Sequence, residues 1–360
     1  MLLSAGLGRR MMPLTLRVPK PAIPVLGRPM AIETLARMAR FGVDEVVINL
    51  HHLPEAVRRM CSEGLSSAIP EVRFSMEEQI LGTAGGLRRA APLLRGAGPI
   101  LLHNCDFLSD IDFAAALAAH RHSGRAATLV VVPARPGYGT VEIDRAGRVV
   151  SLAGRPAVDP ERVAERMLFT GCHLIEEQVL DMIPDDRPSG IVEQVYRPLA
   201  ARGALGGYLH PGFWWEFGTP ELYLEGSLRL LDLPSVRRIE IASHDPVDEI
   251  GSARVAVGAG ATLDDGLRLE GRVAVGMASH VAEGTRLADS VVMRESWIGP
   301  GSRLERVIVG PGVELPAGYR GGRSLICSAD RLPPESIPVD LRREGDLVVY
   351  DFAADRVAGR

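Results

Sequence analysis

The sequence predicts an α/β fold, in which a doubly wound and mostly parallel sheet is followed by a left-handed β-helix. Two patterns support this prediction. In the first part of the chain, short apolar runs alternate with segments of helical periodicity, which is typical of β-α-β units that build a parallel sheet. In the last third, aliphatic residues recur every six positions, and this period suits three short strands per coil of a β-helix.

The alternation extends from residue 29 to residue 132. A helix is expected to begin at Pro29, since the first helical turn tolerates proline, and to end at Gly42. The continuous apolar runs predict strands over 45–50, 72–76, 99–103 and 127–132. Further helices are expected over 54–63, 84–94 and 112–122, the last of them capped by Asp110 and Asp112. In such sheets ligands bind beyond the carboxyl ends of the strands.

The next part of the chain has shorter elements. Strands are expected over 141–144, 149–152, 167–174 and 206–209, and helices over 176–183, 191–202 and 221–231. Residues 232–250 contain two prolines and mixed charges, which are typical of a linker. We therefore predict a first domain over 1–231, a linker over 232–250, a β-helix over 251–324 and a cap or tail over 325–360.

The six-residue repeat is unbroken over its first six members. They are Val257, Leu263, Leu269, Val275, Val281 and Leu287. We expect these side chains to stack inside the coils and glycines such as Gly258 and Gly276 to form the corners. An uncovered coil would expose unpaired backbone groups. We therefore expect residues 325–360 to cap one end, with a strand over 347–350, and a second copy of the chain to cover the rest, which gives a homo-oligomer.

Composition excludes several classes of protein. The chain has 360 residues, of which 46% are hydrophobic and 24% charged, so it can bury a large core. A net charge of −4 argues against a nucleic-acid partner. No apolar stretch approaches the ~20 residues of a membrane span, and glycine and arginine occur too early for a signal peptide. The four scattered cysteines have no metal-ligand spacing and predict reduced thiols in a cytoplasmic protein.

Small residues follow the apolar run at the amino terminus. Ala5, Gly6 and Gly8 come first, and Arg10 follows them. Small residues after a strand let backbone N–H groups approach a phosphate, whose charge a nearby cation neutralises. Only three residues precede this loop, whereas a strand usually has ~5–6, so we expect the natural start of the chain to lie upstream.

Lys20 is the only lysine of the chain, because 40 of the 41 basic residues are arginines. This distribution is expected if position 20 needs a compact ammonium group and not a planar guanidinium. The alternative is an accidental surface lysine, which would be the better interpretation without the glycine loop beside it.

The stretch from Leu3 to Lys20 resembles the signature of the sugar-1-phosphate nucleotidyltransferases, Leu-Ala-Ala-Gly-x-Gly-Thr-Arg-Leu-x-Pro-Leu-Thr-x-x-x-Pro-Lys. The resemblance implies a Rossmann-like nucleotidyltransferase domain and assigns Arg10, Lys20 and Asp106 to catalysis. Arg10 would bind the β- and γ-phosphates, and Lys20 the phosphates beside the reacting phosphorus. One departure is Arg9, which stands where the family has threonine.

The resemblance also implies a Mg²⁺ site. Asp106 follows a predicted buried strand, as the family's first metal ligand does, although Cys105 replaces the family's glycine. Glu216 stands where the family's Trp-x-Asp-x-Gly-Thr-Pro-Glu motif has its second aspartate ligand. Glutamate is also a hard oxygen ligand, one methylene longer. Taken alone, Asp106 would be a turn former and Glu216 a solvated side chain.

Two further segments resemble substrate-binding motifs of the family. Residues 78–86 contain Leu-Gly-Thr-Ala-Gly, which implies that Gln79, Gly82 and Thr83 bind the nucleotide together with Ala5, Gly6 and Gly8. The segments with Gly139, Arg155 and Gly171 resemble those that face the sugar phosphate. Here Gly154 replaces a glutamate that contacts sugar hydroxyls in many members.

The implied reaction joins an NTP and a sugar 1-phosphate to give an NDP-sugar and pyrophosphate. The combination of the Leu-Gly-Thr-Ala-Gly loop and a hexapeptide-repeat domain most resembles mannose-1-phosphate guanylyltransferases. This resemblance favours GTP and mannose 1-phosphate as the substrates. Glucose-1-phosphate uridylyl- and thymidylyltransferases share most of these motifs. A non-catalytic subunit that senses a nucleotide sugar would explain the departures at Arg9, Cys105, Gly154 and Glu216. Acyl transfer by the coils ranks lowest, with His280 as its only candidate base.

Overall fold

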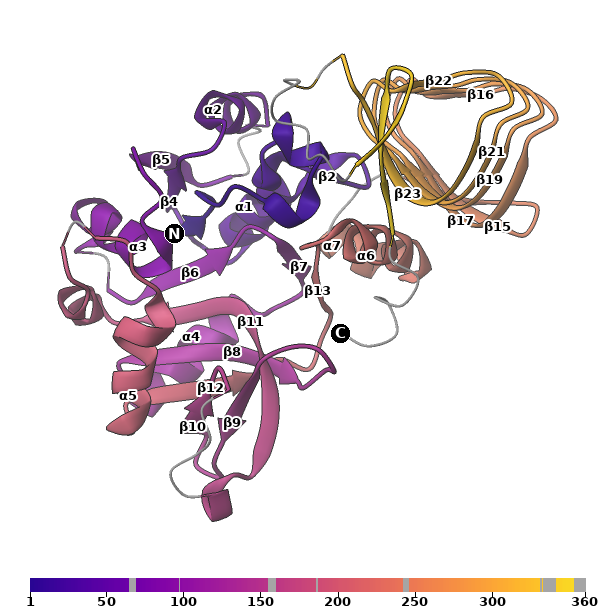
Figure 1. Cartoon of the computed structure of the whole chain (residues 1–360). Helices are drawn as coiled ribbons and strands as arrows, with labels where there is room; N and C mark the ends of the chain where they lie inside the picture. The colour runs from indigo at the N-terminus through magenta and orange to yellow at the C-terminus, as the bar shows by residue number, and fades with distance from the viewer. Residues whose placement is uncertain are drawn as a thin grey trace. The chain divides into compact units, whose positions relative to one another are not determined.

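The computed structural model describes residues 1–64, 69–96, 98–154, 160–185, 187–241, 246–330, 332 and 341–352 (Figure 1). Contacts between residues divide the chain into two compact units. The first comprises Met1–Leu7 and Thr34–Trp214, and the second comprises Gly8–Glu33 and the described residues from Trp215 onward. The glycine loop is therefore shared by the two units, with Gly6 in the first and Gly8 in the second.

A mixed sheet forms the centre of the first unit. Its strands lie in the order β10-β9-β11-β6-β1-β4-β5, and β8 pairs with both β11 and β12. Their bounds are β1 Leu2–Leu3, β4 Glu45–Leu50, β5 Glu71–Met76, β6 Ile100–Asn104, β8 Ala127–Pro133, β9 Thr140–Ile143, β10 Val149–Leu152, β11 Glu165–Ile175 and β12 Leu205–Leu209.

Strands β5-β4-β1-β6 are parallel, as the β-α-β alternation predicts, and β8 and β12 form a second parallel pair. Strand β11 differs, because it runs antiparallel to β6, β8 and β9. Its pairing with β8 shifts register between Phe169 and His173, around Gly171 with a φ of 87°. A bulge of this kind bends the strand, so that β11 can pair with β9 at its start and β6 at its end.

Helices connect and cover these strands (Figure 1). They are α1 Met30–Arg40, α2 Pro54–Glu63, α3 Gly82–Leu94, α4 Phe113–Ser123 and α5 Arg197–Ala201. Helix α3 packs against β4 and β5, and α4 packs against β8, β11 and β12. The helix expected over 191–202 is a π-helical turn, Val192–Tyr196, followed by α5. Pro198 explains the change, since it has no N–H to donate to the preceding turn.

The second unit contains stacked coils of parallel strands. One sheet has β15 Ala253–Val257, β17 Arg268–Val275, β19 Arg286–Val292, β21 Arg303–Val309 and β23 Arg320–Ser328. A second has β16 Thr262–Leu263, β18 His280–Val281, β20 Trp297–Ile298 and β22 Glu314–Leu315. Paired residues lie 18 positions apart from Leu263 to Val281, and 17 apart from Val281 to Ile298. The expected stacking of aliphatic side chains is confirmed, because Val275, Val281 and Leu287 are buried in one core.

Left-handed backbone recurs once per coil at each bend. One such series is Gly266, Gly284, Gly301 and Gly318, with φ of 67–73°. Gly258 and Gly276, the glycines predicted at corners, begin turns, since their carbonyls accept from the N–H groups of Ala261 and Ser279 at 3.1 and 3.2 Å. A Cβ on Gly276 would lie 2.5 Å from the backbone nitrogen of Arg294 in the next coil. These two glycines therefore allow successive coils to approach closely.

Antiparallel strands close both ends of the larger sheet. Strand β14 Val247–Ile250 pairs with β15, and β25 Leu347–Asp351 pairs with β23 and with β24 Arg342–Glu344. Residues 232–250, which we predicted as a linker, contain β14 and helix α7 Ser235–Ile241. Helix α6 Pro220–Asp232 packs against β15, β17, β19 and β21. The predicted domain boundaries stay a prediction.

In the described part of the chain, no helix is both long and apolar enough to cross a bilayer.

The core of the coils yields a prediction about stability. Leu287 is fully buried, so Leu287→Ala should lower the free energy of unfolding by about 2–5 kcal/mol, measured by urea denaturation. Glu283→Ala, at an exposed position of the same coil, should change it by less than about 0.5 kcal/mol. Equal effects of the two variants would contradict the packing described here.

Candidate active site

The carboxyl ends of four parallel strands align at one edge of the sheet in the first unit. Leu50 of β4 pairs with Met76 of β5, and Leu3 of β1 pairs with Asn104 of β6. The residues that follow these strands carry the polar groups of the edge. The glycine loop, the segment before α3 and the turn with Asp106 begin here, as expected for ligand sites in α/β sheets.

A buried network of hydrogen bonds connects these segments. The backbone N–H of Ser4 donates to Oδ1 of Asn49 at 2.8 Å, and its hydroxyl donates to the Asn49 carbonyl at 2.6 Å. Nδ2 of Asn49 donates to Oε1 of Glu77 at 2.7 Å, and the backbone N–H of Leu81 donates to Oε2 at 3.0 Å. Glu77 is only 3% exposed. Its carboxylate therefore fixes the start of the glycine loop relative to the start of α3.

Glycines make room for this network and for the turn into α3. A Cβ on Gly86 would lie 2.4 Å from Oε1 of Glu77, and a Cβ on Gly82 would lie 2.7 Å from the Ser189 carbonyl. Gly82 also has a φ of 72°, which favours glycine. Oγ1 of Thr83 accepts from the backbone N–H of Ile191 at 2.9 Å. Gln79 is exposed. The structure thus holds the predicted nucleotide segment firmly at Gly82 and Thr83.

The glycine loop has its tightest point at Gly8. Its φ is 62°, and a Cβ there would lie 2.8 Å from Cγ2 of Thr15. The Thr15 hydroxyl donates to the Gly8 carbonyl at 2.9 Å, which closes the loop. Ala5 is buried, whereas Gly6 is exposed, and a Cβ on Gly6 would meet no atom within 4 Å. Backbone around Gly6 is therefore accessible to a ligand.

Lys20 and Arg10 lie in the second unit with Gly8. Lys20 is half-buried and is the first residue of a 3₁₀ turn, Lys20–Ala22. Pro19 and Pro21 flank the lysine in the sequence. A Cβ on Gly8 would lie 3.6 Å from the Cβ of Lys20. The structure thus brings the single lysine beside the glycine loop, as the sequence signature implies.

Glu216 and Arg10 form an ion pair at 3.1 Å between Oε1 and Nη2. The Arg10 side chain is 61% exposed and that of Glu216 is 15% exposed. Gly218 borders this pair, because a Cβ there would lie 2.1 Å from Oε1 of Glu216. Thr219 then caps α6 by accepting from the Leu222 N–H at 3.3 Å. The predicted metal ligand therefore lies beside a predicted phosphate ligand.

Asp106 lies in the tight turn between β6 and strand β7 Phe107–Ser109. The N–H of Cys105, which is buried, donates to the Leu3 carbonyl at 3.3 Å and anchors this turn on β1. A Cβ on Gly171 would lie 2.7 Å from Nδ2 of Asn104. The structure therefore brings the predicted sugar-facing residue Gly171 next to the turn that carries Asp106.

Trp214 is held by the same part of the first unit. Its indole N–H donates to the Thr170 carbonyl at 2.9 Å, and the Arg135 guanidinium lies 5.4 Å from its ring centre. Asp110 was expected to cap α4, and this expectation is wrong. Oδ1 of Asp110 accepts from the Phe213 N–H at 2.6 Å and pairs with Nε2 of His210 at 2.9 Å. Asp110 thus fixes the segment before Trp214, and Asp112 alone caps α4.

Other predicted residues have a less defined setting. Gly139 is exposed with open space at its Cβ position. Arg155 lies outside the described residues, and Gly154 before it has a φ of 74°. His280 stacks on Trp297 at 4.2 Å, and its ring nitrogens contact Thr262 at 2.9 Å and Asp264 at 3.0 Å.

Three buried titratable groups near this edge, His103, Cys172 and His173, are uncharged. Burial lowers the pKa of His103 and the pKa of His173 to about 3. Burial also raises the pKa of the Cys172 thiol to about 12. All three groups are therefore neutral at neutral pH and act as structural groups. The charges available to a ligand at this edge come from other residues, such as Asp106.

No group of three or more histidine, cysteine, aspartate or glutamate side chains that could hold a metal occurs among the described residues. A Mg²⁺ ion needs fewer protein ligands, because it keeps several waters and binds substrate phosphates. The carboxylates of Asp106 and Glu216 have the chemistry of such ligands.

Sequence reasoning missed Ser4, Asn49, Glu77 and Asp110 as positioning residues. One signal was present for Asn49, since it interrupts the apolar run of β4 just before the carboxyl end. Glu77 also stands directly after a strand, but Glu78 beside it looks equivalent in the sequence. The partners of both residues depend on tertiary structure, and no local pattern reveals them.

Comparisons with known proteins agree with these motifs. The model of the nucleotidyl transferase family matches residues 1–232. A mannose-1-phosphate guanylyltransferase of Mycobacterium tuberculosis is 30% identical over 316 residues, covering 84% of this chain and 82% of the relative. Mannose-1-phosphate guanylyltransferase 1 of Arabidopsis thaliana is 31% identical over 315 residues, covering 86% and 85%.

Two further matches are more distant. A UTP–glucose-1-phosphate uridylyltransferase of Synechocystis sp. is 26% identical over 333 residues, covering 84% of this chain and 85% of the relative. The crystal structure of HddC from Yersinia pseudotuberculosis matches with a TM-score of 0.53 and 18% identity, covering 63% of this chain and 97% of that chain. At this identity the likeness shows the fold alone.

The buried network yields a second prediction. In Glu77→Gln the amide offers one oxygen acceptor in place of two, so one buried donor loses its partner. We expect the free energy of unfolding to fall by about 1–3 kcal/mol in urea denaturation, with faster hydrogen exchange at the Leu81 amide. The matched control is Glu78→Gln, at the exposed neighbouring position. The network would lose its assigned role if both variants behaved alike.

Proposed function

The chain belongs to the nucleotidyl transferase family, and we propose that it transfers a guanylyl group from GTP to mannose 1-phosphate and releases pyrophosphate. The named relatives with about 30% identity support this choice of substrates. The observation that carries the proposal is the lone lysine beside the glycine loop, since Lys20 and Gly8 are neighbours in the structure.

We infer a mechanism without a protein nucleophile. The phosphate oxygen of the sugar 1-phosphate attacks the α-phosphorus in line, and pyrophosphate leaves. The protein positions the two substrates and stabilises the charge that develops on the phosphoryl oxygens. Backbone N–H groups near Gly6 and Gly8 bind the triphosphate, Lys20 contacts the phosphates around the reacting phosphorus, and Arg10 binds the β- and γ-phosphates. Gly82 and Thr83 hold the segment that meets the base.

Asp106 and Glu216 are proposed to hold Mg²⁺, which supplies charge neutralisation to the phosphates when it is bound. Two carboxylates suit this ion, whose remaining ligands are waters and phosphate oxygens. Arg10 now occupies Oε1 of Glu216. A triphosphate offers Arg10 a second anionic partner, so substrate binding and release of the Glu216 carboxylate are coupled in this proposal.

The finer assignments stay predictions. The uridylyltransferase among the relatives supports UTP with glucose 1-phosphate as an alternative pair of substrates. The motifs shared with thymidylyltransferases leave dTTP as a further alternative. The 17- and 18-residue spacing of the paired strands supports a left-handed β-helix, and we propose that it mediates homo-oligomerisation. The four cysteines are free and buried, which supports a cytoplasmic location.

A matrix of NTPs against sugar 1-phosphates tests the proposed substrates. We expect Mg²⁺-dependent pyrophosphate release to be greatest with GTP and mannose 1-phosphate. UTP or dTTP with glucose 1-phosphate as the best pair would replace this assignment. A protein that binds nucleotide sugars and releases no pyrophosphate from any pair would be a sensor subunit.

Lys20→Ala tests the role of the lysine. Loss of a preorganised cation at the reacting phosphorus should lower kcat/KM by about 10²- to 10³-fold, measured by pyrophosphate release. Lys20→Arg should also be impaired, because a guanidinium fork replaces a compact ammonium. Arg17→Ala, which removes an exposed cation from the same segment, serves as the control. Normal turnover in Lys20→Ala would refute the role given to Lys20.

A further inference from the structure

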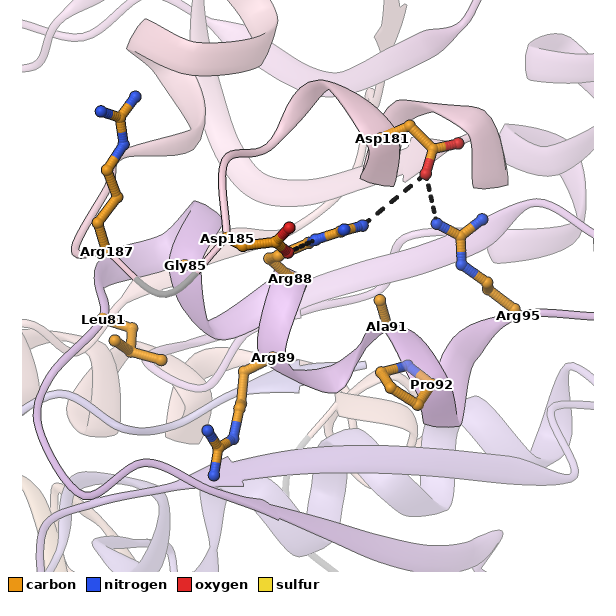
Figure 2. A pocket seen from close by; sticks show the side chains of 10 residues that line it. All are labelled: Leu81, Gly85, Arg88, Arg89, Ala91, Pro92, Arg95, Asp181, Asp185 and Arg187. Atoms are coloured by element: carbon orange, nitrogen blue, oxygen red, sulfur yellow. Dashed lines mark hydrogen bonds and ion pairs between the residues drawn. The ribbon is translucent and has the colours of Figure 1, made fainter.

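A pocket of about 450 Å³ lies along helix α3 in the first unit (Figure 2). Its lining is braced by ion pairs. Nε of Arg88 lies 2.5 Å from Oδ1 of Asp185, and Nη2 of Arg95 lies 2.6 Å from Oδ1 of Asp181. None of the residues that we propose to bind substrate lines this pocket. The side chain that supports two of them lies in helix α6 of the second unit.

Tyr223 of α6 is bonded to the segment that follows Lys20. Its hydroxyl donates to the Pro24 carbonyl at 2.6 Å. The N–H of Ile23, directly before Pro24, donates to the Lys20 carbonyl at 3.2 Å and closes the 3₁₀ turn. Ile23 is fully buried, and Pro21 and Pro24 restrict the backbone on either side of it. The Tyr223 hydroxyl is therefore connected to Lys20 by a short and constrained length of chain.

The ring of the same tyrosine packs on the segment that carries Glu216. It contacts the ring of Phe217 edge to face, with centroids 6.1 Å apart, and Phe217 is fully buried. Gly226 lies three residues after Tyr223 on the same side of α6. It leaves room for the Phe217 ring, since a Cβ there would lie 2.7 Å from Cε1 of Phe217. Glu216, directly before Phe217, is thereby held where its carboxylate pairs with Arg10.

Tyr223 is itself firmly held and keeps its proton. It is 1% exposed, and its backbone N–H donates to the Thr219 carbonyl at 2.8 Å in the first turn of α6. Burial raises the pKa of the Tyr223 hydroxyl, so this group is protonated at neutral pH and acts as the donor to Pro24. A tyrosine at this depth supports the site without contact to a substrate.

We propose that Tyr223 is a positioning residue for nucleotidyl transfer, which sets the spacing between the segments of Lys20 and Glu216. Its hydroxyl fixes the first segment and its ring fixes the second, and all of these residues belong to one unit. The inference rests on the roles proposed for Lys20 and Glu216. A shift of the Lys20 segment would misplace the ammonium group at the reacting phosphorus, and small misplacements of this kind lower the rate of the chemical step.

Tyr223→Phe tests the inference, because it removes the hydroxyl and keeps the ring. We expect kcat for pyrophosphate release from GTP and mannose 1-phosphate to fall about tenfold, with each KM within about twofold of the wild type. The matched control is Tyr319→Phe, since the Tyr319 hydroxyl donates to Oε2 of Glu344 at 2.7 Å elsewhere in the same unit. Both variants should lower the midpoint of urea denaturation by a similar amount, and Tyr319→Phe should keep the wild-type kcat.

A double-mutant cycle shows whether Tyr223 acts through Lys20. The variant Lys20→Ala/Tyr223→Phe should have the kcat/KM of Lys20→Ala within about twofold, because the hydroxyl positions a group that is already absent. A merely structural tyrosine would give additive effects. Additive effects, or an unchanged kcat in Tyr223→Phe, would overturn the inference.

Phe217→Leu, which changes the ring contact and keeps the hydroxyl, replaces Tyr223→Phe if that variant does not fold, with Glu216→Gln as its partner in the cycle. It should also lower kcat, and an unchanged kcat or an additive cycle would again overturn the inference. Normal turnover in Lys20→Ala, or a wild type that releases no pyrophosphate from any substrate pair, would refute the proposed function and the inference with it. An impaired Lys20→Ala beside a normal Tyr223→Phe would refute the inference alone.

Discussion

The buried carboxylate of Glu77 is the interaction on which the first unit's site depends. A charged group this deep must be fully hydrogen-bonded, because an unpaired buried charge is strongly destabilising. Here one oxygen is bound to Asn49 and the other to the Leu81 N–H. Asn49 in turn holds Ser4, so a single carboxylate sets the distance between the two segments that we propose to bind substrate. The same carboxylate explains why position 86 is a glycine, since any side chain there would occupy the position of the carboxylate.

In the second unit, the residues proposed to bind phosphate and metal are held by constrained backbone and by an ion pair. Thr15 closes the loop at Gly8, and two prolines flank Lys20, so the ammonium group starts from a constrained backbone. The Arg10 side chain is 61% exposed and that of Glu216 is 15% exposed, and the two neutralise each other at 3.1 Å. An ion pair with a solvent-exposed partner contributes little stability, so Arg10 can exchange partners at a low energetic cost. That property suits two residues whose proposed ligands are a phosphate and a metal ion.

Most helices and strands could be predicted from the sequence, because the spacing of hydrophobic residues and the positions of glycines depend on local structure. The strands Glu45–Leu50 and Val149–Leu152 and the helix Pro54–Glu63 have the predicted bounds. The direction of β11, the capping strand β14 and the role of Asp110 were not predictable, since each depends on partners distant in the chain. Among the proposed site residues, the family motifs indicated Gly8, Lys20 and Glu216, whose roles stay predictions. The motifs could not reveal Glu77, whose role depends on being buried beside Asn49.

The central claim is that the glycine loop and Lys20 bind the triphosphate while Gly82 and Thr83 meet the base. A crystal structure with Mg²⁺ and a GTP analogue that cannot be cleaved at the α-phosphorus tests it most directly. We expect phosphate oxygens within about 3 Å of the Lys20 amine and of backbone N–H groups near Gly8, with the base against Gly82. A nucleotide bound elsewhere, with Lys20 remote from every phosphate, would contradict the account.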